Sequence, residues 1–214
     1  MPQNPEACRL YLITPDEIAD LDAFASELES ALSAGDVACL QLRLKGVEDD
    51  VIIAAAHKLM PICHKYEVAF LINDRADIAA DVDADGVHLG QDDGDVPTAR
   101  KLLGHAKDIG VTCHDSMHLA YKAGEEGANY VAFGAFYPSE TKDSEYRPDV
   151  EILTVWDEVT EIPCVAIGGI TPENCGVLAE AGAHFVAVCS AVWKHPEGPA
   201  AAVRAFNEAL GLSE

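Results

Sequence analysis

The sequence is poor in basic residues. Only 14 lysines and arginines stand against 37 aspartates and glutamates, which leaves a net charge of −23. A surface of this sign repels nucleic acid and anionic membranes, so functions that depend on either are excluded. The plain interpretation of the acidity is solubility or adaptation to salt. If the chain binds phosphates, its few cations must gather at one place.

The sequence also lacks long apolar runs and paired cysteine motifs. No 18 consecutive residues are apolar, and the first ten, MPQNPEACRL, hold no apolar signal region, so we expect neither a membrane span nor a secretion signal. The seven cysteines are odd in number, form no CxxC motif and lie mostly in apolar runs, where cysteine acts as a small core residue. This usage predicts a reducing cytoplasm without a disulfide framework.

What the sequence does contain is a regular series of short, β-rich runs. They cover residues 10–14, 37–44, 69–74, 86–91, 108–113, 130–136, 164–170 and 185–192. Helical patterns lie between most of them, at 15–33, 49–64, 116–126, 172–181 and 196–210, with Pro61 expected to end or kink the second; the stretches after the third and fourth runs are short. Eight strand–helix units with right-handed crossovers predict an α/β fold, a closed (β/α)8 TIM barrel.

No linker or low-complexity segment divides the 214 residues, so we expect a single domain over residues 1–214, with the barrel at about residues 10–210. An open doubly wound sheet is the structural alternative. The count of eight strands and the polar residues at strand ends favour the barrel. The sequence does not decide between a monomer and a homo-oligomer.

The second strand breaks the rule that parallel strands are apolar on both faces. In CLQLRLK, the three leucines share one face, while Gln41, Arg43 and Lys45 share the other. The leucines can face the helices, which turns the polar side chains into the barrel. Buried cations are costly unless an anion meets them, so this face predicts an anion site. A solvated edge strand would explain the same pattern, but a closed barrel has no edge.

The third and fourth strands end in carboxylates, Asp74 after Asn73 and Asp93 after Gln91. Neighbouring strands would bring these oxygen ligands to one rim. Mg²⁺ prefers one or two carboxylates together with substrate phosphate oxygens, so the pair is a candidate magnesium site. Helix capping by the two aspartates is the alternative, because aspartate is a good N-cap residue.

Polar and glycine-rich segments follow the later strands as well. The sixth strand leads into a loop with Ser139, Thr141 and Lys142, which is either a plain turn or part of the site. Gly169 ends the seventh strand, and Cys189 and Ser190 end the eighth. Barrels often bind phosphate at these two loops, where glycine lets backbone N–H groups approach it.

The histidines and cysteines give weaker signals. His114 and His118 have an HxxxH spacing but lack the adjacent glutamate of zinc proteases. His114 at the end of the fifth strand is a candidate acid–base group. Cys113 has no evident base beside it, so we expect it to pack in the core or line the mouth.

Six of these segments, taken in order, resemble the thiamine phosphate synthase family over nearly the whole chain. They are QLRLK at 41–45, NDR at 73–75, ADGVHLGQDD at 84–93, PSETK at 138–142, AIGGI at 166–170 and CSA at 189–191. The resemblance implies that a pyrimidine diphosphate is joined to a thiazole phosphate, giving thiamine phosphate and pyrophosphate with Mg²⁺. It implies no protein nucleophile, because the electron-rich aminopyrimidine carries the developing carbocation.

The resemblance also implies roles for individual residues. Asp74 and Asp93 would bind the metal, and Thr112 would contact the pyrimidine. The diphosphate would lie among Arg43, Lys45, Asn73 and Lys142 with Gln41 nearby, and the catalytic set would be Arg43, Lys45, Thr112 and Lys142. The thiazole phosphate would be held by Ser139, Thr141, Gly169, Cys189 and Ser190.

The chain departs from the family pattern at four positions. Leu44 stands where a glutamate is common, Thr112 for a serine, Ser139 for a threonine and Ala135 for a proline. Two alternatives remain from these residues: a thiazole tautomerase-like isomerase that would use His114, and a barrel that only binds thiamine precursors. The cations and the two aspartates argue against both, because neither alternative needs a grip on a diphosphate.

Overall fold

The computed structural model describes residues 7–138 and 145–212 of the chain. Its strands are β1 (Arg9–Ile13), β2 (Cys39–Leu42), β3 (Ala69–Asn73), β4 (Gly86–Leu89), β5 (Asp108–His114), β6 (Tyr130–Gly134), β7 (Cys164–Ile167) and β8 (Phe185–Val188). Each strand pairs in parallel with its sequence neighbours, and β1 pairs with β8, so the sheet closes into a barrel. This confirms the predicted TIM barrel.

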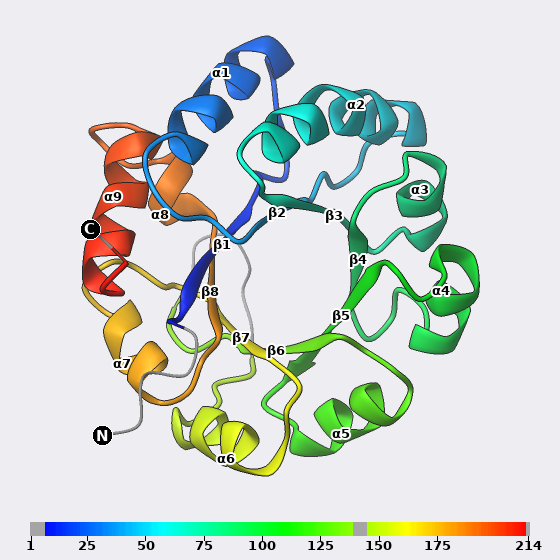
Figure 1. Cartoon of the computed structure of the whole chain (residues 1–214), viewed down its shortest axis with the longest axis vertical. Helices are drawn as coiled ribbons and strands as arrows, with labels where there is room; N and C mark the ends of the chain where they lie inside the picture. Colours follow the sequence, from blue (N-terminus) through cyan, green and yellow to red (C-terminus); the bar gives the residue numbers. More distant parts are fainter. Residues whose placement is uncertain (1–6, 139–144, 213–214) are drawn as a thin grey trace.

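The helices surround the barrel (Figure 1). They are α1 (Leu21–Leu32), α2 (Asp49–Lys65), α3 (Ala76–Asp81), α4 (Val96–Leu103), α5 (Met117–Glu125), α6 (Glu151–Val159), α7 (Cys175–Glu180), α8 (Ser190–Trp193) and α9 (Pro199–Ala209). Every predicted strand corresponds to an observed one. Among the described residues, no helix is long and apolar enough to cross a bilayer.

Alternating side chains of the strands build two separate cores. Leu40 and Leu42 belong to the outer core between strands and helices. Tyr11, Cys39 and Tyr130 belong to a smaller cluster inside the barrel. Gln41 is buried beside that inner cluster, where Tyr11 donates a hydrogen bond to it. The predicted two faces of the second strand are therefore confirmed as far as Leu42, whereas Arg43 and Lys45 lie beyond the end of β2.

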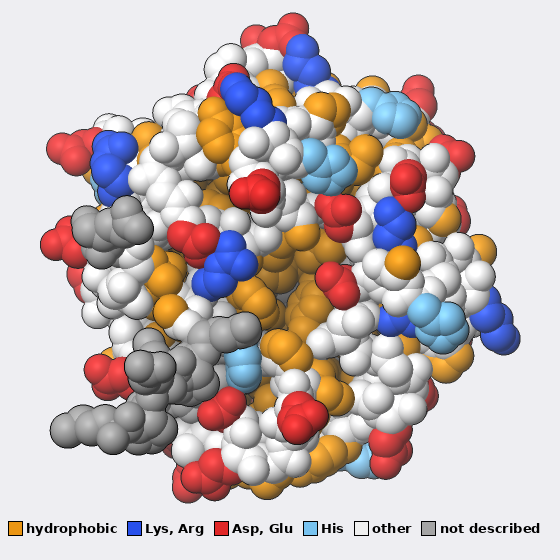
Figure 2. Space-filling model, in the orientation of Figure 1, with side chains coloured by type: hydrophobic (Ala, Val, Ile, Leu, Met, Phe, Trp, Pro, Cys, Tyr) orange, Lys and Arg blue, Asp and Glu red, His pale blue; other side chains and the backbone are white. Residues whose placement is uncertain are grey.

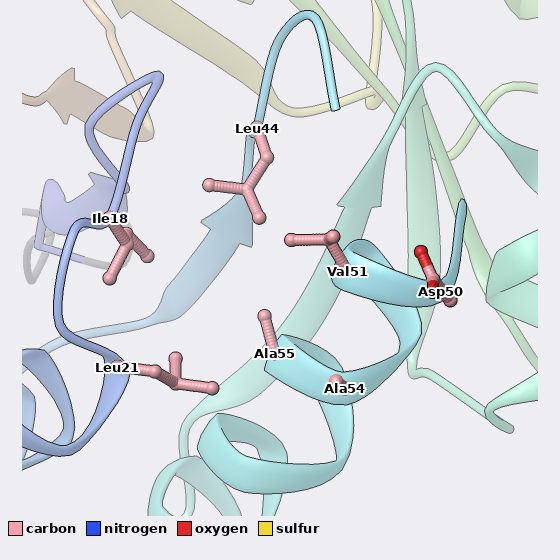
Figure 3. Close-up of a pocket in the computed structure, with 7 residues that line it drawn as sticks. All are labelled: Ile18, Leu21, Leu44, Asp50, Val51, Ala54 and Ala55. Atoms are coloured by element: carbon pink, nitrogen blue, oxygen red, sulfur yellow. The ribbon is translucent and has the colours of Figure 1, made fainter. Parts of the chain in front are cut away.

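Leu44 continues the helix-facing side beyond the end of β2. It lines a small apolar pocket with Ile18 and Leu21 from one side and Val51 and Ala55 of α2 from the other (Figure 3). A leucine here packs between α1 and α2 and points away from the interior of the barrel. The departure from the family's glutamate thus lies outside the polar face that carries Gln41.

Three local predictions were wrong in extent or missing. The eighth strand ends at Val188, and the next residues form the short helix α8, so Val192 is helical. Helix α6 was not predicted, although its Leu153 and Trp156 are fully buried on one face. Helix α2 runs through Pro61 to Lys65, because the neighbouring turns are held in the core by buried side chains.

The surface reflects the composition. Figure 2 shows acidic side chains spread widely over the face it presents, around a central hollow with hydrophobic side chains in its depth. The ion pairs of this surface are mostly exposed, such as Lys58 with Asp22 and Lys65 with Glu29. Exposed pairs of this kind contribute little to stability, because solvent screens them.

Candidate active site

The carboxyl ends of the parallel strands meet at one mouth of the barrel, which is where TIM-barrel enzymes place their active sites. The described part of the chain brings most of the predicted residues to these ends. Those residues are Gln41, Arg43, Lys45, Asn73, Asp74, Asp93, Thr112, Gly169, Cys189 and Ser190. They come from β2, β3, β4, β5, β7 and β8 or from the residues that follow them.

Asp74 and Asp93 form a carboxyl pair after β3 and β4. The pKa of Asp93 is raised, first by burial and then by the charge of Asp74 and a hydrogen bond between the two carboxyl groups. Asp74 has a φ of 65°, a left-handed conformation that costs a non-glycine residue on the order of 1–3 kcal/mol. Two acids held this close without a cation destabilise each other, so the pair suits a positively charged ligand.

Neither aspartate of the pair caps a helix with its side chain. The residue before α3 is Arg75, which forms no side-chain cap. Asp95 caps α4, accepting a hydrogen bond from the backbone N–H of Thr98. The capping alternative for Asp74 and Asp93 is therefore wrong.

Two cations lie beside the carboxyl pair or near it. Lys45 Nζ lies 2.5 Å from Asp74 Oδ2, and Asn73 Nδ2 donates to the same oxygen at 2.6 Å. Arg43 forms an ion pair with Asp16 of the β1–α1 loop, and its backbone N–H donates to Thr14 Oγ1. Each of the two cations is thus paired with an aspartate of the mouth, Lys45 with Asp74 and Arg43 with Asp16.

The two carboxyl groups are donors of the kind that Mg²⁺ takes in proteins. The described residues hold no group of three or more His, Cys, Asp or Glu side chains arranged for a metal. Mg²⁺, however, usually takes one or two carboxylates and fills its other positions with water and phosphate oxygens. The donor set is hard oxygen throughout, which suits Mg²⁺ better than zinc.

A row of hydrogen-bonded polar side chains crosses the barrel interior below the mouth. Gln41 Nε2 donates to Asn73 Oδ1 at 2.7 Å, and Tyr11 donates to Gln41 Oε1 at 3.1 Å. The hydroxyls of Tyr11 and Tyr130 lie 3.0 Å apart. His88 contacts the Tyr130 hydroxyl at 3.0 Å. The row joins the carboxyl pair to the far side of the site.

The row ends at Thr112, whose Oγ1 lies 2.8 Å from the second ring nitrogen of His88. Three of its members, Tyr11, His88 and Tyr130, were not predicted as site residues. The alternation that revealed Gln41 would have found two of them. Tyr11 stands between Leu10 and Leu12, and His88 between Val87 and Leu89, each a polar group on the inward face of a buried strand.

The loop after β7 is shaped by two glycines. Gly168 and Gly169 have φ values of 103° and 62°, and a Cβ on Gly169 would lie 2.2 Å from the carbonyl oxygen of Pro138. Phe136 and Tyr137 donate backbone hydrogen bonds to Ile167 and Gly168. The glycines therefore hold the exit of β6 against β7, and no larger residue fits there.

Cys189 and Ser190 lie where β8 passes into α8. The Cys189 thiol donates to the carbonyl of Thr14 at 3.5 Å. Its pKa is raised to about 11, first by burial and then by Asp16, while Arg43 and Lys194 act in the opposite direction. These influences place Cys189 near the Arg43–Asp16 pair, on the β8 side of the mouth.

The two other candidate groups on β5, Cys113 and His114, pack against neighbouring parts of the protein. Cys113 is fully buried, and burial raises the pKa of its thiol to about 12, so it does not serve as a nucleophile at neutral pH. His114 has a φ of 56° and stacks on Tyr146 with ring centroids 4.2 Å apart. The predicted Ser139, Thr141 and Lys142 lie outside the described residues.

The fold and the site define a class: a single-sheet parallel barrel enzyme with cations, a carboxyl pair and a polar row at the carboxyl ends of its strands. The chain belongs to the thiamine monophosphate synthase family, whose model matches residues 10–192. Membership confirms the resemblance of the six sequence segments.

Relatives with curated descriptions agree over nearly the full length. The thiamine-phosphate synthase of Rhodospirillum centenum is 57% identical over 203 residues, covering 95% of this chain and 98% of the relative. That of Hyphomonas neptunium is 53% identical, covering 93% and 92%. The solved thiamine phosphate pyrophosphorylase of Pyrococcus furiosus is 28% identical, with a TM-score of 0.83 and 95% of each chain covered.

The function follows from these similarities. The chain is a transferase of thiamine biosynthesis, and its reaction is thiamine phosphate synthesis. A 3-hexulose-6-phosphate synthase shares the barrel with a TM-score of 0.69 at 20% identity, which shows a common fold alone.

Proposed function

We propose that this chain carries out the synthase reaction with Mg²⁺ held by Asp74 and Asp93, and that the substrates are an aminopyrimidine methyl diphosphate and a thiazole phosphate. The observation that carries the proposal is the carboxyl pair with Lys45 against it, at the mouth of the barrel. When bound, the metal supplies positive charge to the diphosphate oxygens as they become the leaving group.

Arg43, Lys45 and Asn73 are the residues proposed to hold the diphosphate. Lys45 Nζ and Asn73 Nδ2 both point to Asp74 Oδ2, so they meet at the oxygen that a metal-bound diphosphate would approach. Arg43 offers a fork of N–H donors suited to phosphate oxygens, and its side chain is only 19% exposed. Lys142 would join this set from the loop after β6.

The chemistry needs electrostatic stabilisation more than a protein nucleophile. The bond between the pyrimidine methylene carbon and the diphosphate oxygen breaks, and its electron pair leaves with the diphosphate. The thiazole nitrogen then donates its own pair to the methylene carbon. Lys45 and Arg43 stabilise the charge that collects on the diphosphate, which is the step that preorganised charges accelerate most.

The thiazole phosphate is expected at the ends of β7 and β8. Gly169 follows β7, is only partly buried and has no side chain to screen its backbone, and Ser190 begins α8. The charge of Arg43 acts on the Cys189 thiol, so the two proposed phosphate sites would lie near each other. Ser139 and Thr141 complete this site in the proposal.

The reaction is expected in the cytoplasm. All seven cysteines are free thiols, and six of them are buried. A reducing compartment keeps such thiols intact.

The first test is pyrophosphate release on mixing the two substrates, with Mg²⁺ and then with a chelator. Release that needs both substrates and the metal, with thiamine phosphate as product, supports the proposal. Asp74→Asn, which tolerates the left-handed backbone, should lower turnover about 100-fold or more at ordinary Mg²⁺ concentrations.

Asp95→Asn is the matched control, because it removes one carboxylate from the same loop region and keeps a good capping side chain. It should turn over like the wild type. Wild-type turnover by Asp74→Asn, or undiminished release in chelator, would contradict the metal assignment. Isomerisation of the thiazole without pyrophosphate release would move the function to an isomerase.

A further inference from the structure

The polar row inside the barrel has a fixed direction, and its starting point is the Asp74 carboxylate. A carboxylate only accepts hydrogen bonds, so Asn73 must present Nδ2 to it, as it does at 2.6 Å. This leaves Asn73 Oδ1 to accept from Gln41 Nε2. Gln41 Oε1 then accepts from the Tyr11 hydroxyl. Reversing either amide would set two acceptors against each other.

The direction passes through the two tyrosines. Each phenol has one proton, and burial holds the pKa of both Tyr11 and Tyr130 well above the ordinary value. The Tyr11 hydroxyl already donates its one hydrogen bond to Gln41 Oε1. The 3.0 Å contact between the two hydroxyls therefore requires Tyr130 to donate. With its proton used, Tyr130 accepts from His88 Nδ1, which is therefore the protonated ring nitrogen.

The tautomer of His88 determines the direction of its hydrogen bond with Thr112. The ring is buried, and both of its nitrogens contact hydroxyl groups, Tyr130 on one side and Thr112 on the other. Its nitrogens contact hydroxyl groups rather than carboxylates, and a buried charge without a counter-charge is costly, so the imidazole is neutral. A neutral ring protonated at Nδ1 has an unprotonated Nε2, and the Thr112 hydroxyl donates its proton to that nitrogen.

We propose that this one-way row fixes the Thr112 hydroxyl as a hydrogen-bond acceptor toward the substrate, so that the site selects a pyrimidine with an amino group over the same ring with a carbonyl oxygen. The inference rests on the proposed function, which brings the pyrimidine to Thr112. An amino N–H finds an acceptor there. A carbonyl oxygen would meet the lone pairs of Thr112 and lose its hydrogen bond to water.

The same row makes Tyr11, Tyr130 and His88 positioning residues. They act through Thr112 by deciding which way its proton points. The barrel is built to hold the middle of the row, because β5 carries Gly110 opposite the Tyr130 ring. A Cβ on Gly110 would lie 1.9 Å from Tyr130 Cζ, so only glycine leaves room for this ring.

The kinetic test compares kcat/KM for the 4-amino and the 4-oxo pyrimidine diphosphates. A site built to hydrogen-bond a substrate N–H rejects the analogue without it strongly, and we expect the wild type to favour the amino substrate by about 100-fold or more. Tyr130→Phe removes the hydroxyl that accepts from His88 Nδ1, so the proton of the ring is no longer fixed on that nitrogen. The ratio of the two kcat/KM values should then fall by about tenfold or more. Thr112→Val should bring the ratio close to one.

Two variants serve as controls. Thr112→Ser keeps the hydroxyl and should keep the ratio. Tyr121→Phe removes a phenol from the exposed outer side of α5 and should change neither rate nor ratio. An equal loss on both substrates in Tyr130→Phe, with the ratio unchanged, would show a merely structural role and overturn the proposal.

A second measurement tests the row without any turnover. In the ¹⁵N spectrum of the histidine side chains at neutral pH, assigned with His88→Gln, the wild type should show Nδ1 protonated and Nε2 unprotonated. A ring protonated at Nε2, or at both nitrogens, overturns the proposal. Absence of turnover with either pyrimidine, together with the expected spectrum, would instead count against the proposed function alone.

Discussion

Single residues in the mouth have competing partners, and Lys45 is the clearest case. Its ammonium group contacts Asp74 Oδ2 at 2.5 Å, the same oxygen that the proposed metal would use. Lys45 therefore stabilises the carboxyl pair in this structure, and in the proposed reaction it would meet the diphosphate when the substrate arrives. Under the proposed function, the same residue would oppose metal binding in one state and support catalysis in the other.

Lys45→Met should separate these two effects in opposite directions. Without the ammonium group, Mn²⁺ alone should bind about three- to tenfold more tightly, a modest gain because the Lys45 side chain is 44% exposed and screened by solvent. The value of kcat/KM should fall about 100-fold, because the leaving diphosphate loses a cation. Calorimetry and steady-state kinetics measure the two quantities.

Lys58→Met is the control for this variant, since Lys58 pairs with Asp22 on the outer helices. It should leave metal affinity and rate unchanged. Weaker metal binding in Lys45→Met would mean that Lys45 organises Asp74 for the metal, which contradicts the competition described above.

At the scale of elements, the strands and their inward residues were largely predictable, and for a physical reason. The alternation in β2 marks its buried polar face in the sequence itself, so Gln41 could be assigned to the barrel interior from that pattern alone. The row that joins Gln41 to Thr112 could not, because its direction depends on contacts between residues 24 to 119 positions apart. Sequence shows which groups face inward, while the partner of each is set by barrel closure.

Helices were less predictable than strands for the same kind of reason. Pro61 removes a backbone donor from α2, yet Leu59 and Cys63 on either side are fully buried, and this packing outweighs the local penalty. Helix α6 was missed because its burial depends on Trp156 packing against Phe133 of β6. Burial that depends on contacts with other elements is hard to predict from the residue pattern of a short segment.

The exit loops of β6 and β7 behave as one element, and Gly168→Ala should show it. The added methyl group would lie 2.3 Å from the Ala135 Cβ, and alanine is strained at a φ of 103°. We expect unfolding free energy to fall by about 2–4 kcal/mol, from strain together with overpacking. Urea denaturation measures it.

Gly176→Ala is the matched control, because a Cβ there meets nothing within 4 Å and the residue lies in α7. Alanine is the better helix former, so this variant should be neutral or more stable by up to about 1 kcal/mol. Equal stability of the two variants would contradict the close packing of the two loops.

The whole molecule combines a strongly acidic surface with a core rich in thiols. Cys8, Cys63, Cys113 and Cys164 each have a pKa raised from 9.0 to about 12, with burial as the main cause. The folded protein keeps these protons between pH 9 and 12, where an unfolded chain would release them. The unfolded state then binds fewer protons, so stability decreases as pH rises through this window.

The contribution of these thiols to the free energy of unfolding should therefore be constant below pH 9 and decrease steeply above it. Each buried thiol contributes a slope of about 1.4 kcal/mol per pH unit, a large effect against a total stability of about 5–15 kcal/mol. Cys63→Ala should reduce the slope by that amount, measured by urea denaturation at several pH values between 9 and 11. Leu59→Ala, in the same helix and equally buried, should lower stability at every pH and leave the slope unchanged. If both variants kept the wild-type slope, the alkaline loss of stability would have to come from the growing repulsion among surface carboxylates and tyrosinates instead of from the thiols in the core.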